Sequence, residues 1–298
     1  MEYIEAKTII SGYREGNPWF GHNYNMNIYK GCCHGCIYCD SRSECYGVEE
    51  FDRVRAKDKA LEIIERDLRS KRKKGVIGTG AMSDPYNPLE KEAGLTREAL
   101  KLIDQYGFGI AIATKSTLIE RDLDLLVKIS KHSPVIVKIT VTTADDELCK
   151  LIEPNVAPTS ERFQAIKACS DAGIFTGVLM MPILPYINDT EGNVSNVISL
   201  AGQNGAKFIY PAFGVTLRQN QREWYYSQLD HKFPGIKEKY MQRYANAYEC
   251  ASPNARELWK LFMYQCREQN ILYKMEDIIR EYTDKYKVEQ LSLFDFNS

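Results

Sequence analysis

The stretch NIYKGCCHGCIYCDSR (residues 27–42) is the part of this chain that says most about its fold and chemistry. Three residues separate Cys32 from Cys36, two separate Cys36 from Cys39, and the aromatic Tyr38 precedes the last thiol. Thiolates at this spacing can hold three irons of a cubane cluster and leave the fourth iron open. An open iron can coordinate a small molecule and pass an electron to it. The stretch therefore predicts a [4Fe-4S] cluster with one exchangeable site.

Other uses of these cysteines fit less well. Zinc would need a fourth ligand, which His34 or an extra cysteine supplies only nominally, because His34 is crowded between the first two thiols. A disulfide framework is disfavoured, since nine cysteines in 298 residues are an odd and sparse set. The cysteines outside the motif are interpreted as small apolar residues or unpaired thiols: Cys33, Cys45, Cys149, Cys169, Cys250 and Cys266.

The composition is that of an ordinary globular protein. Of its 298 residues, 44% are hydrophobic and 27% charged, with a formal net charge of −1. No run approaches the roughly 18 apolar residues that span a bilayer, and the first residues lack the basic and apolar blocks of a secretion signal. The basic run RSKRKK (residues 69–74) is interpreted as a solvated helix end. We therefore expect a cytoplasmic protein with no membrane partner.

Short β-rich runs alternate with amphipathic helical stretches, which predicts an α/β fold with a mainly parallel sheet. The expected strands are 25–29, 75–79, 108–114, 135–142, 175–181 and 207–211. Six such units suit a partial (βα)6 TIM-like barrel, in which chemistry gathers at the carboxyl ends of the strands. The expected parts are an N-terminal extension (1–24), the core barrel (25–213), a small helical C-terminal region (214–286) and a flexible tail (287–298).

The cysteine spacing is the hallmark of radical S-adenosylmethionine (SAM) enzymes. Together with TGAMSDPYNPLE (79–90), IATKSTLIERDLDLL (112–126), residues 138–162 and GVLMMPILPYIND (177–189), it makes the chain resemble the radical SAM subgroup related to spore photoproduct lyase. The resemblance implies a [4Fe-4S] cluster, bound SAM and an external electron donor. It also implies reductive cleavage of SAM, giving methionine and a 5′-deoxyadenosyl radical that abstracts hydrogen from a substrate.

The resemblance also implies which residues contact SAM. These are Tyr38, Gly80, Ser83, Lys115, Thr140, Arg162 and Pro182. Tyr38 and Pro182 would lie near the adenine, and Lys115 near the carboxylate or ribose. Structural interpretations stay open: Lys115 as a solvated lysine, Thr140 as an ordinary strand residue and Pro182 as a strand end. Arg162 could instead form an ion pair with Glu153 that orients its loop.

One departure bears on the substrate. Ala81, in GAMSD, occupies the place of the lyase cysteine that returns a hydrogen atom to the product radical. Alanine has no weak bond to hydrogen, so the catalytic hydrogen donor is unknown unless Cys33, Cys45, Tyr86 or another residue supplies it. The resemblance favours an enzyme that acts on damaged or modified DNA. The alternatives are modification of RNA, protein or a metabolite, and a non-catalytic iron–sulfur binding or sensor protein.

The chain ends in VEQLSLFDFNS (residues 288–298). Within it, Gln290, Leu291, Leu293 and Phe294 resemble the short motif with which bacterial proteins dock on the replication sliding clamp. A glutamine amide at a pocket rim and apolar side chains in a cleft would anchor an extended peptide. The alternative is that these apolar residues cover a patch of the same chain.

Overall fold

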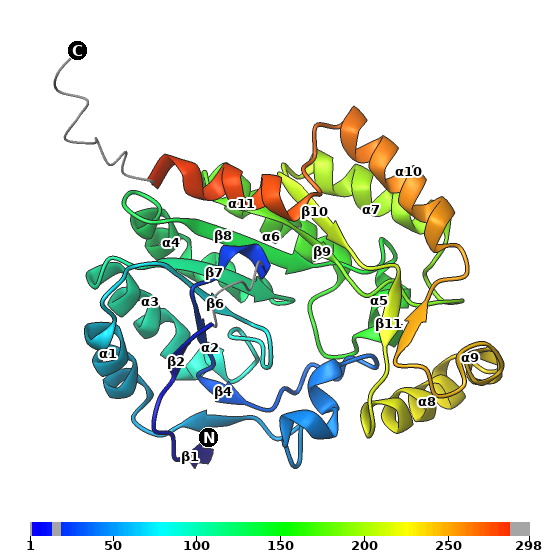
Figure 1. Cartoon of the computed structure of the whole chain (residues 1–298), viewed down its shortest axis with the longest axis horizontal. Coiled ribbons are helices and arrows are strands. Elements are labelled where there is room, and N and C mark those ends of the chain that lie inside the picture. Colours follow the sequence, from blue (N-terminus) through cyan, green and yellow to red (C-terminus); the bar gives the residue numbers. More distant parts are fainter. Residues whose placement is uncertain (1, 14–18, 287–298) are drawn as a thin grey trace, which may run out of the picture.

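The structure, a computed structural model, describes residues 2–13 and 19–286. Its main sheet has the strand order β10-β9-β8-β7-β6-β3-β2 (Figure 1). These strands are β2 (Ile10–Gly12), β3 (Tyr24–Met26), β6 (Val76–Thr79), β7 (Gly109–Thr114), β8 (Val135–Thr140), β9 (Phe175–Met180) and β10 (Phe208–Pro211). All are parallel except β2, which runs antiparallel to β3. Because β2 and β10 are edges rather than partners, the barrel is open, which confirms the predicted partial (βα)6 fold.

Helices cover the outer face of this sheet (Figure 1). They are α1 (Ala60–Ser70), α3 (Leu95–Gln105), α4 (Leu123–Ile129), α6 (Thr159–Asp171) and α7 (Glu191–Gln203), with the short η4 (Thr117–Asp122) before α4. Two short helices, α2 (Glu90–Ala93) and α5 (Asp146–Ile152), lie in the segments that follow β6 and β8. Outward strand residues such as Ile77, Ile112 and Ile139 are fully buried beneath them. This layer forms the main hydrophobic core and fixes the strand ends in space.

The entry into the cysteine loop differs from the prediction of one strand over 25–29. β3 ends at Met26, and the chain then leaves the main sheet. β4 (Tyr29–Lys30) instead pairs antiparallel with β5 (Arg55–Lys57), which also pairs with β1 (Glu2–Ile4) in a separate small sheet. The predicted strand was wrong because β-propensity does not reveal which partner a strand joins. The cysteine loop therefore follows β4.

The inner face of the barrel is closed at the amino ends of the strands. There, η1 (Trp19–Gly21) and α11 (Met275–Thr283) meet through Phe20, Ile278 and Tyr282. These side chains pack against inward strand residues such as Ile136. The α11 helix is followed by η5 (Asp284–Tyr286). The carboxyl ends of the strands are left as the place for a site.

The C-terminal region holds α8 (Gln221–Lys232), α9 (Ile236–Tyr244) and α10 (Ala255–Glu268), and also a two-stranded sheet of β11 (Gly214–Thr216) and β12 (Glu249–Ala251). The α8–α9 pair lies beside the cysteine loop, where Gln221 Nε2 donates to Tyr38 O at 3.0 Å. The loop continues into η2 (Asp40–Arg42) and η3 (Glu44–Tyr46). Across residues 2–13 and 19–286, no helix has the length and apolarity needed to cross a bilayer.

Candidate active site

The cysteine loop is held by backbone contacts to distant segments. Cys32 N donates to Phe51 O at 2.8 Å, and Ile37 N donates to Ile152 O at 3.0 Å. Gly31 adopts φ +81°, and a Cβ there would lie 2.6 Å from Phe51 O. Only glycine fits this close approach in the left-handed region. The thiols are therefore presented on a fixed backbone.

A cavity of about 190 Å³ lies at the carboxyl ends of β6, β7 and β8. Its lining brings together all three motif cysteines and most predicted SAM contacts: Cys32, Cys36, Cys39, Tyr38, Gly80, Ser83, Lys115 and Thr140. Arg162 and Pro182 are not part of this lining. The roles of these residues toward a cofactor stay predictions. Their position at the strand carboxyl ends is the one expected for this barrel type.

Asp84 is a lining residue that the sequence reasoning did not single out. Its carboxylate accepts hydrogen bonds from Thr114 Oγ1 at 2.7 Å and from Lys115 N at 2.8 Å. His34 Nδ1 lies 3.6 Å from the same carboxylate. Asp84 thus ties β7 to the cysteine loop and sets the backbone that presents Lys115. The signal was available, because Asp84 directly follows Ser83 in GAMSD.

A buried chain of polar groups supports Tyr38. The Tyr38 hydroxyl donates to Glu153 Oε1, and Arg162 Nη2 donates to Glu153 Oε2 at 2.6 Å. Arg162 also donates to Thr140 O at 2.7 Å and to Ala157 O at 2.8 Å. Burial would raise the pKa of Glu153, but Arg162 and Lys115 lower it overall. In this structure Arg162 is engaged with protein groups, which is the ion-pair alternative that the sequence left open.

The thiols sit in an environment that keeps them protonated until a metal binds. Burial raises the pKa of Cys32 to about 12, and it raises the pKa of Cys36 and Cys39 as well. Burial would lower the pKa of Lys115, but Cys36 and Cys39 once they are ionised, together with the carboxylates of Glu153 and Asp84, raise it overall. A metal that supplies positive charge displaces such protons. The donor set is thus suited to metal ligation.

The three motif thiols share one cavity, which is compatible with cluster ligation. Within the described ranges, no three Cys, His, Asp or Glu side chains converge closely enough to hold one metal ion. A cubane takes each thiolate on a different iron, so its ligands share a cavity without meeting at one point. Cys32, Cys36 and Cys39 have this relation to the cavity.

Two predicted SAM contacts have a second, structural role. Ser83 Oγ donates to Gly31 O at 2.6 Å and so anchors the cysteine loop to the end of β6. At Gly80, with φ +93°, a Cβ would lie 1.9 Å from Ala113 O. This position lets the backbone reach the cavity without a side chain in the way.

The hydrogen donor stays unassigned. Ala81 lines the cavity. Neither Cys33, Cys45 nor Tyr86 belongs to the lining. Tyr86 borders a different cavity, and Cys45 is exposed.

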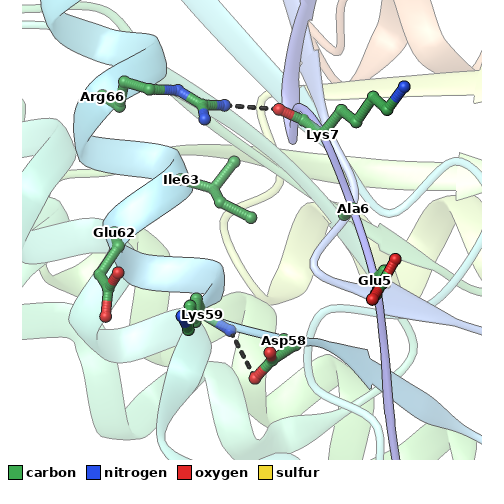
Figure 2. A pocket seen from close by; sticks show the side chains of 8 residues that line it. All are labelled: Glu5, Ala6, Lys7, Asp58, Lys59, Glu62, Ile63 and Arg66. Carbon is green, nitrogen blue, oxygen red and sulfur yellow. Dashed lines mark hydrogen bonds between the residues drawn. The ribbon is translucent and has the colours of Figure 1, made fainter.

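A larger cavity, of about 610 Å³, lies elsewhere, between the N-terminal segment and α1 (Figure 2). Its lining is mostly charged, and Figure 2 shows Lys59 N donating to Asp58 and Arg66 donating to Lys7 O. Opposite charges alternate around it, as is typical of a solvated surface. It contains no residue of the cysteine loop.

Comparison with known proteins gives distant relatives in bacteria and archaea. An uncharacterized protein of Mycobacterium tuberculosis is 27% identical over 228 residues, which is 74% of this chain and 67% of the relative. An uncharacterized protein of Methanocaldococcus jannaschii is 34% identical over 174 residues, which is 57% of this chain and 64% of that protein.

Solved structures of spore photoproduct lyase variants share the fold. One has a TM-score of 0.65 at 13% identity and covers 91% of this chain and 81% of its own. Another, bound to a dinucleoside spore photoproduct, has a TM-score of 0.63 at 14% identity, with coverages of 89% and 78%. At such identities the likeness establishes the architecture.

The sequence profile of the radical SAM superfamily matches residues 26–194, more than half of the chain. The match includes the three motif cysteines and the strands β6 to β9 that carry the cavity. Members of this superfamily use a [4Fe-4S] cluster together with SAM. On these grounds the protein is an enzyme of the radical SAM superfamily.

Proposed function

We propose that this enzyme holds a [4Fe-4S] cluster on Cys32, Cys36 and Cys39 and cleaves SAM reductively. When bound, the cluster and SAM together supply a 5′-deoxyadenosyl radical that abstracts hydrogen from an unreactive carbon. The observation that carries the proposal is the shared cavity at the strand carboxyl ends, where the three thiols meet Lys115 and Thr140. An external donor provides the electron. We place the reaction in the cytoplasm, where a reducing environment protects the cluster.

The side chains of the protein bind and orient SAM and shield the reaction from water. Lys115 offers a positive charge to the SAM carboxylate, and Tyr38, held by Glu153, lies against the adenine. Thr140 offers a hydroxyl to the ribose. The remaining wall includes Leu179, which is 6% exposed. Such an apolar wall keeps water from a reactive intermediate.

The proposal is tested with anaerobically reconstituted full-length protein, SAM and dithionite, by measuring iron content and 5′-deoxyadenosine. The Cys36→Ala variant is expected to lose the cluster and to make 5′-deoxyadenosine only at background level, because one iron loses its thiolate. Cys33→Ala is the matched control, since this adjacent thiol does not line the cavity, and it should retain its iron. Undiminished turnover by Cys36→Ala would contradict the ligand assignment.

The substrate class belongs to the same proposal: damaged or modified DNA. Support comes from the resemblance to the lyase subgroup and from the shared fold with a lyase variant bound to a dinucleoside spore photoproduct. Because Ala81 stands where the lyase has cysteine, we do not assign splitting of that photoproduct by the same route. A different lesion or modified base is the expected target.

Deuterium transfer separates DNA from the other substrates. DNA labelled at candidate carbons should pass deuterium into 5′-deoxyadenosine, whereas RNA, protein and metabolite pools should not. Transfer from one of those pools instead would replace DNA as the substrate. If reduced cluster and SAM give no 5′-deoxyadenosine at all, the chain is better explained as a non-catalytic sensor.

The clamp-like motif at Gln290, Leu291, Leu293 and Phe294 lies outside the described residues and stays a prediction. We propose it as a docking peptide for a sliding clamp. Deleting residues 290–298 should abolish binding to purified clamp and leave SAM cleavage unchanged, because the cavity lining lies within residues 32–179. Surface plasmon resonance with immobilised clamp is the measurement, and persistent binding by the truncated chain would refute docking.

A further inference from the structure

Three contacts join residues 218–224, which contain the start of α8, to the segment directly after Cys39. They are an ion pair of Arg218 Nε with Asp40 Oδ1 at 3.2 Å, a hydrogen bond from Glu44 N to Gln219 O at 3.3 Å, and the Arg42 guanidinium 4.0 Å from the centre of the Trp224 ring. The match to the radical SAM profile ends at residue 194, so the α8 side of this attachment lies beyond it. The cysteine loop is therefore held in part by the C-terminal region.

Gln221, the first residue of α8, makes a further contact that reaches the motif itself. Its side chain is fully buried, and its Nε2 donates to Tyr38 O at 3.0 Å and to Thr216 O at 2.7 Å. Its Oε1 accepts from Arg218 N at 2.9 Å. The bonds to Thr216 and Arg218 are local to the start of the helix, whereas the bond to Tyr38 spans 183 positions. This third bond ties α8 to the cysteine loop.

The Tyr38 carbonyl belongs to the peptide unit that joins Tyr38 to Cys39. A peptide unit is planar, so a bond that holds its oxygen also sets the direction of the Cys39 N–H. Cys39 N donates to Cys36 O at 3.3 Å, at the opposite edge of the same unit. Rotation of this plane would turn the Cα–Cβ bond of Cys39 and move its thiol. The orientation of the third motif thiol therefore depends on Gln221.

A buried apolar cluster joins the motif to α8 and α9. It combines side chains of the cysteine loop with side chains of the two helices, among them Cys36, Ile37, Tyr38, Tyr225, Leu229 and Tyr240. Because Gln221 is itself fully buried, water cannot take over its hydrogen bonds unless this cluster repacks. Removal of the amide would leave Tyr38 O and Thr216 O without this donor, which is costly for buried acceptors.

We infer that Gln221 is a positioning residue for the third ligand of the cluster. It acts through the peptide unit between Tyr38 and Cys39 and does not line the cavity. The inference rests on the proposed cluster at Cys32, Cys36 and Cys39, and it adds a residue outside the motif that sets the geometry of that site. Without the amide N–H groups, the Cys39 thiol loses its fixed direction and holds its iron less tightly.

The test compares Gln221→Met with Gln265→Met in anaerobically reconstituted full-length protein. Methionine keeps the length of the side chain and removes the amide. Gln265 is the matched control, because its half-buried amide on α10 donates to Ser195 Oγ at 2.9 Å and lies outside the cavity lining. Release of iron to bathophenanthroline is followed by absorbance, and the reduced cluster is examined by electron paramagnetic resonance.

Gln221→Met should release iron about tenfold faster than the unaltered protein, which is the scale of one buried hydrogen bond, and should shift the g values of the reduced cluster. Gln265→Met should change neither. Thermal unfolding of the cluster-free chains shows how much stability each variant loses. A Gln221→Met protein that loses stability but keeps the iron release and g values of the unaltered protein would reduce Gln221 to a structural role and overturn the inference.

Hydrogen exchange of the unaltered, cluster-free chain needs no variant, so it decides the matter even if Gln221→Met folds poorly. The amides of Cys39 and Glu44 should exchange about a hundredfold more slowly than in an unfolded chain, and exchange at the unfolded rate would refute the attachment. If the unaltered protein forms no [4Fe-4S] cluster, the proposed function fails and this inference fails with it. A cluster that Gln221→Met holds as tightly as the unaltered protein rejects only the inference.

Discussion

Glu153 joins two parts of the candidate site through one buried carboxylate. One oxygen accepts from the Tyr38 hydroxyl in the cysteine loop, and the other accepts from Arg162 in α6. Arg162 in turn donates to Thr140 O at the end of β8. Because both charged side chains are at most 1% exposed, neither can recover hydration if its partner is removed. This pair therefore positions Tyr38 and the β8 end relative to each other.

We expect Glu153→Gln to lower the free energy of unfolding by about 3 kcal/mol, because it leaves the Arg162 charge buried and unpaired. Glu147→Gln is the control, since Glu147 is 81% exposed in its pair with Lys150 and should change stability by less than about 0.5 kcal/mol. Urea unfolding of the cluster-free chains measures both. Similar losses in the two variants would mean that burial does not set the strength of the Glu153 pair.

Among the strands, the close packing of the end of β6 against β7 determines whether the backbone at Gly80 can line the cavity. The residue after β6, Gly80, has φ +93° and no room for a Cβ beside Ala113 O. The strands could separate to admit a side chain only by giving up register pairs such as Thr79 with Ile112.

Gly80→Ala is expected to destabilise the protein by more than 2 kcal/mol, at about the scale of combined steric and backbone strain, and to reduce 5′-deoxyadenosine formation at least tenfold. Gly173→Ala separates backbone strain from steric overlap. Gly173 also has a positive φ, of +76°, but no atom lies within 4 Å of the added Cβ. It should lose about 1 kcal/mol and keep SAM cleavage. Thermal unfolding and product analysis give both numbers, and an unaffected Gly80→Ala enzyme would disprove the tight approach.

The whole molecule closes its barrel with segments from both ends of the chain. Phe20, near the N-terminus, and α11, near the C-terminus, pack together against the inner face at the strand amino ends. The Tyr282 hydroxyl also donates to Phe20 O. In Figure 1, α11 is drawn in red and η1 in blue, the two ends of the sequence colour scale. The closed end leaves the carboxyl ends as the accessible side.

Two adjacent isoleucines on α11 test this closure. Ile278 is fully buried, and Ile278→Ala should lower stability by about 3 kcal/mol through lost burial and a residual cavity. Ile279 is only partly buried, and Ile279→Ala should lose less than half as much. Chemical denaturation of the two variants side by side is the measurement. A larger loss at Ile279 would show that α11 packs with its other side on the barrel.

Several strands of the main sheet could be predicted from the local pattern of apolar residues. The strands 75–79, 108–114 and 175–181 are found within about two residues of their expected bounds, because each is a continuous apolar run between turn residues. The prediction of one strand over 25–29 was wrong because its two halves belong to different sheets. A short segment does not show which strand it will pair with. The β11–β12 pair was missed for the same reason, since each strand has only three residues.

The three-thiol motif, its chemistry and the succession of βα units follow from spacing and periodicity, which depend on neighbours along the chain. Three side-chain pairs depend instead on contacts between residues that are apart in the sequence. The separation is 30 positions for Asp84 and Thr114, 9 for Arg162 and Glu153, and 116 for Lys138 and His22. Such partners are chosen by how strands and loops pack in three dimensions. Burial then sets how strongly the charged groups interact, and these groups are buried only in the folded chain.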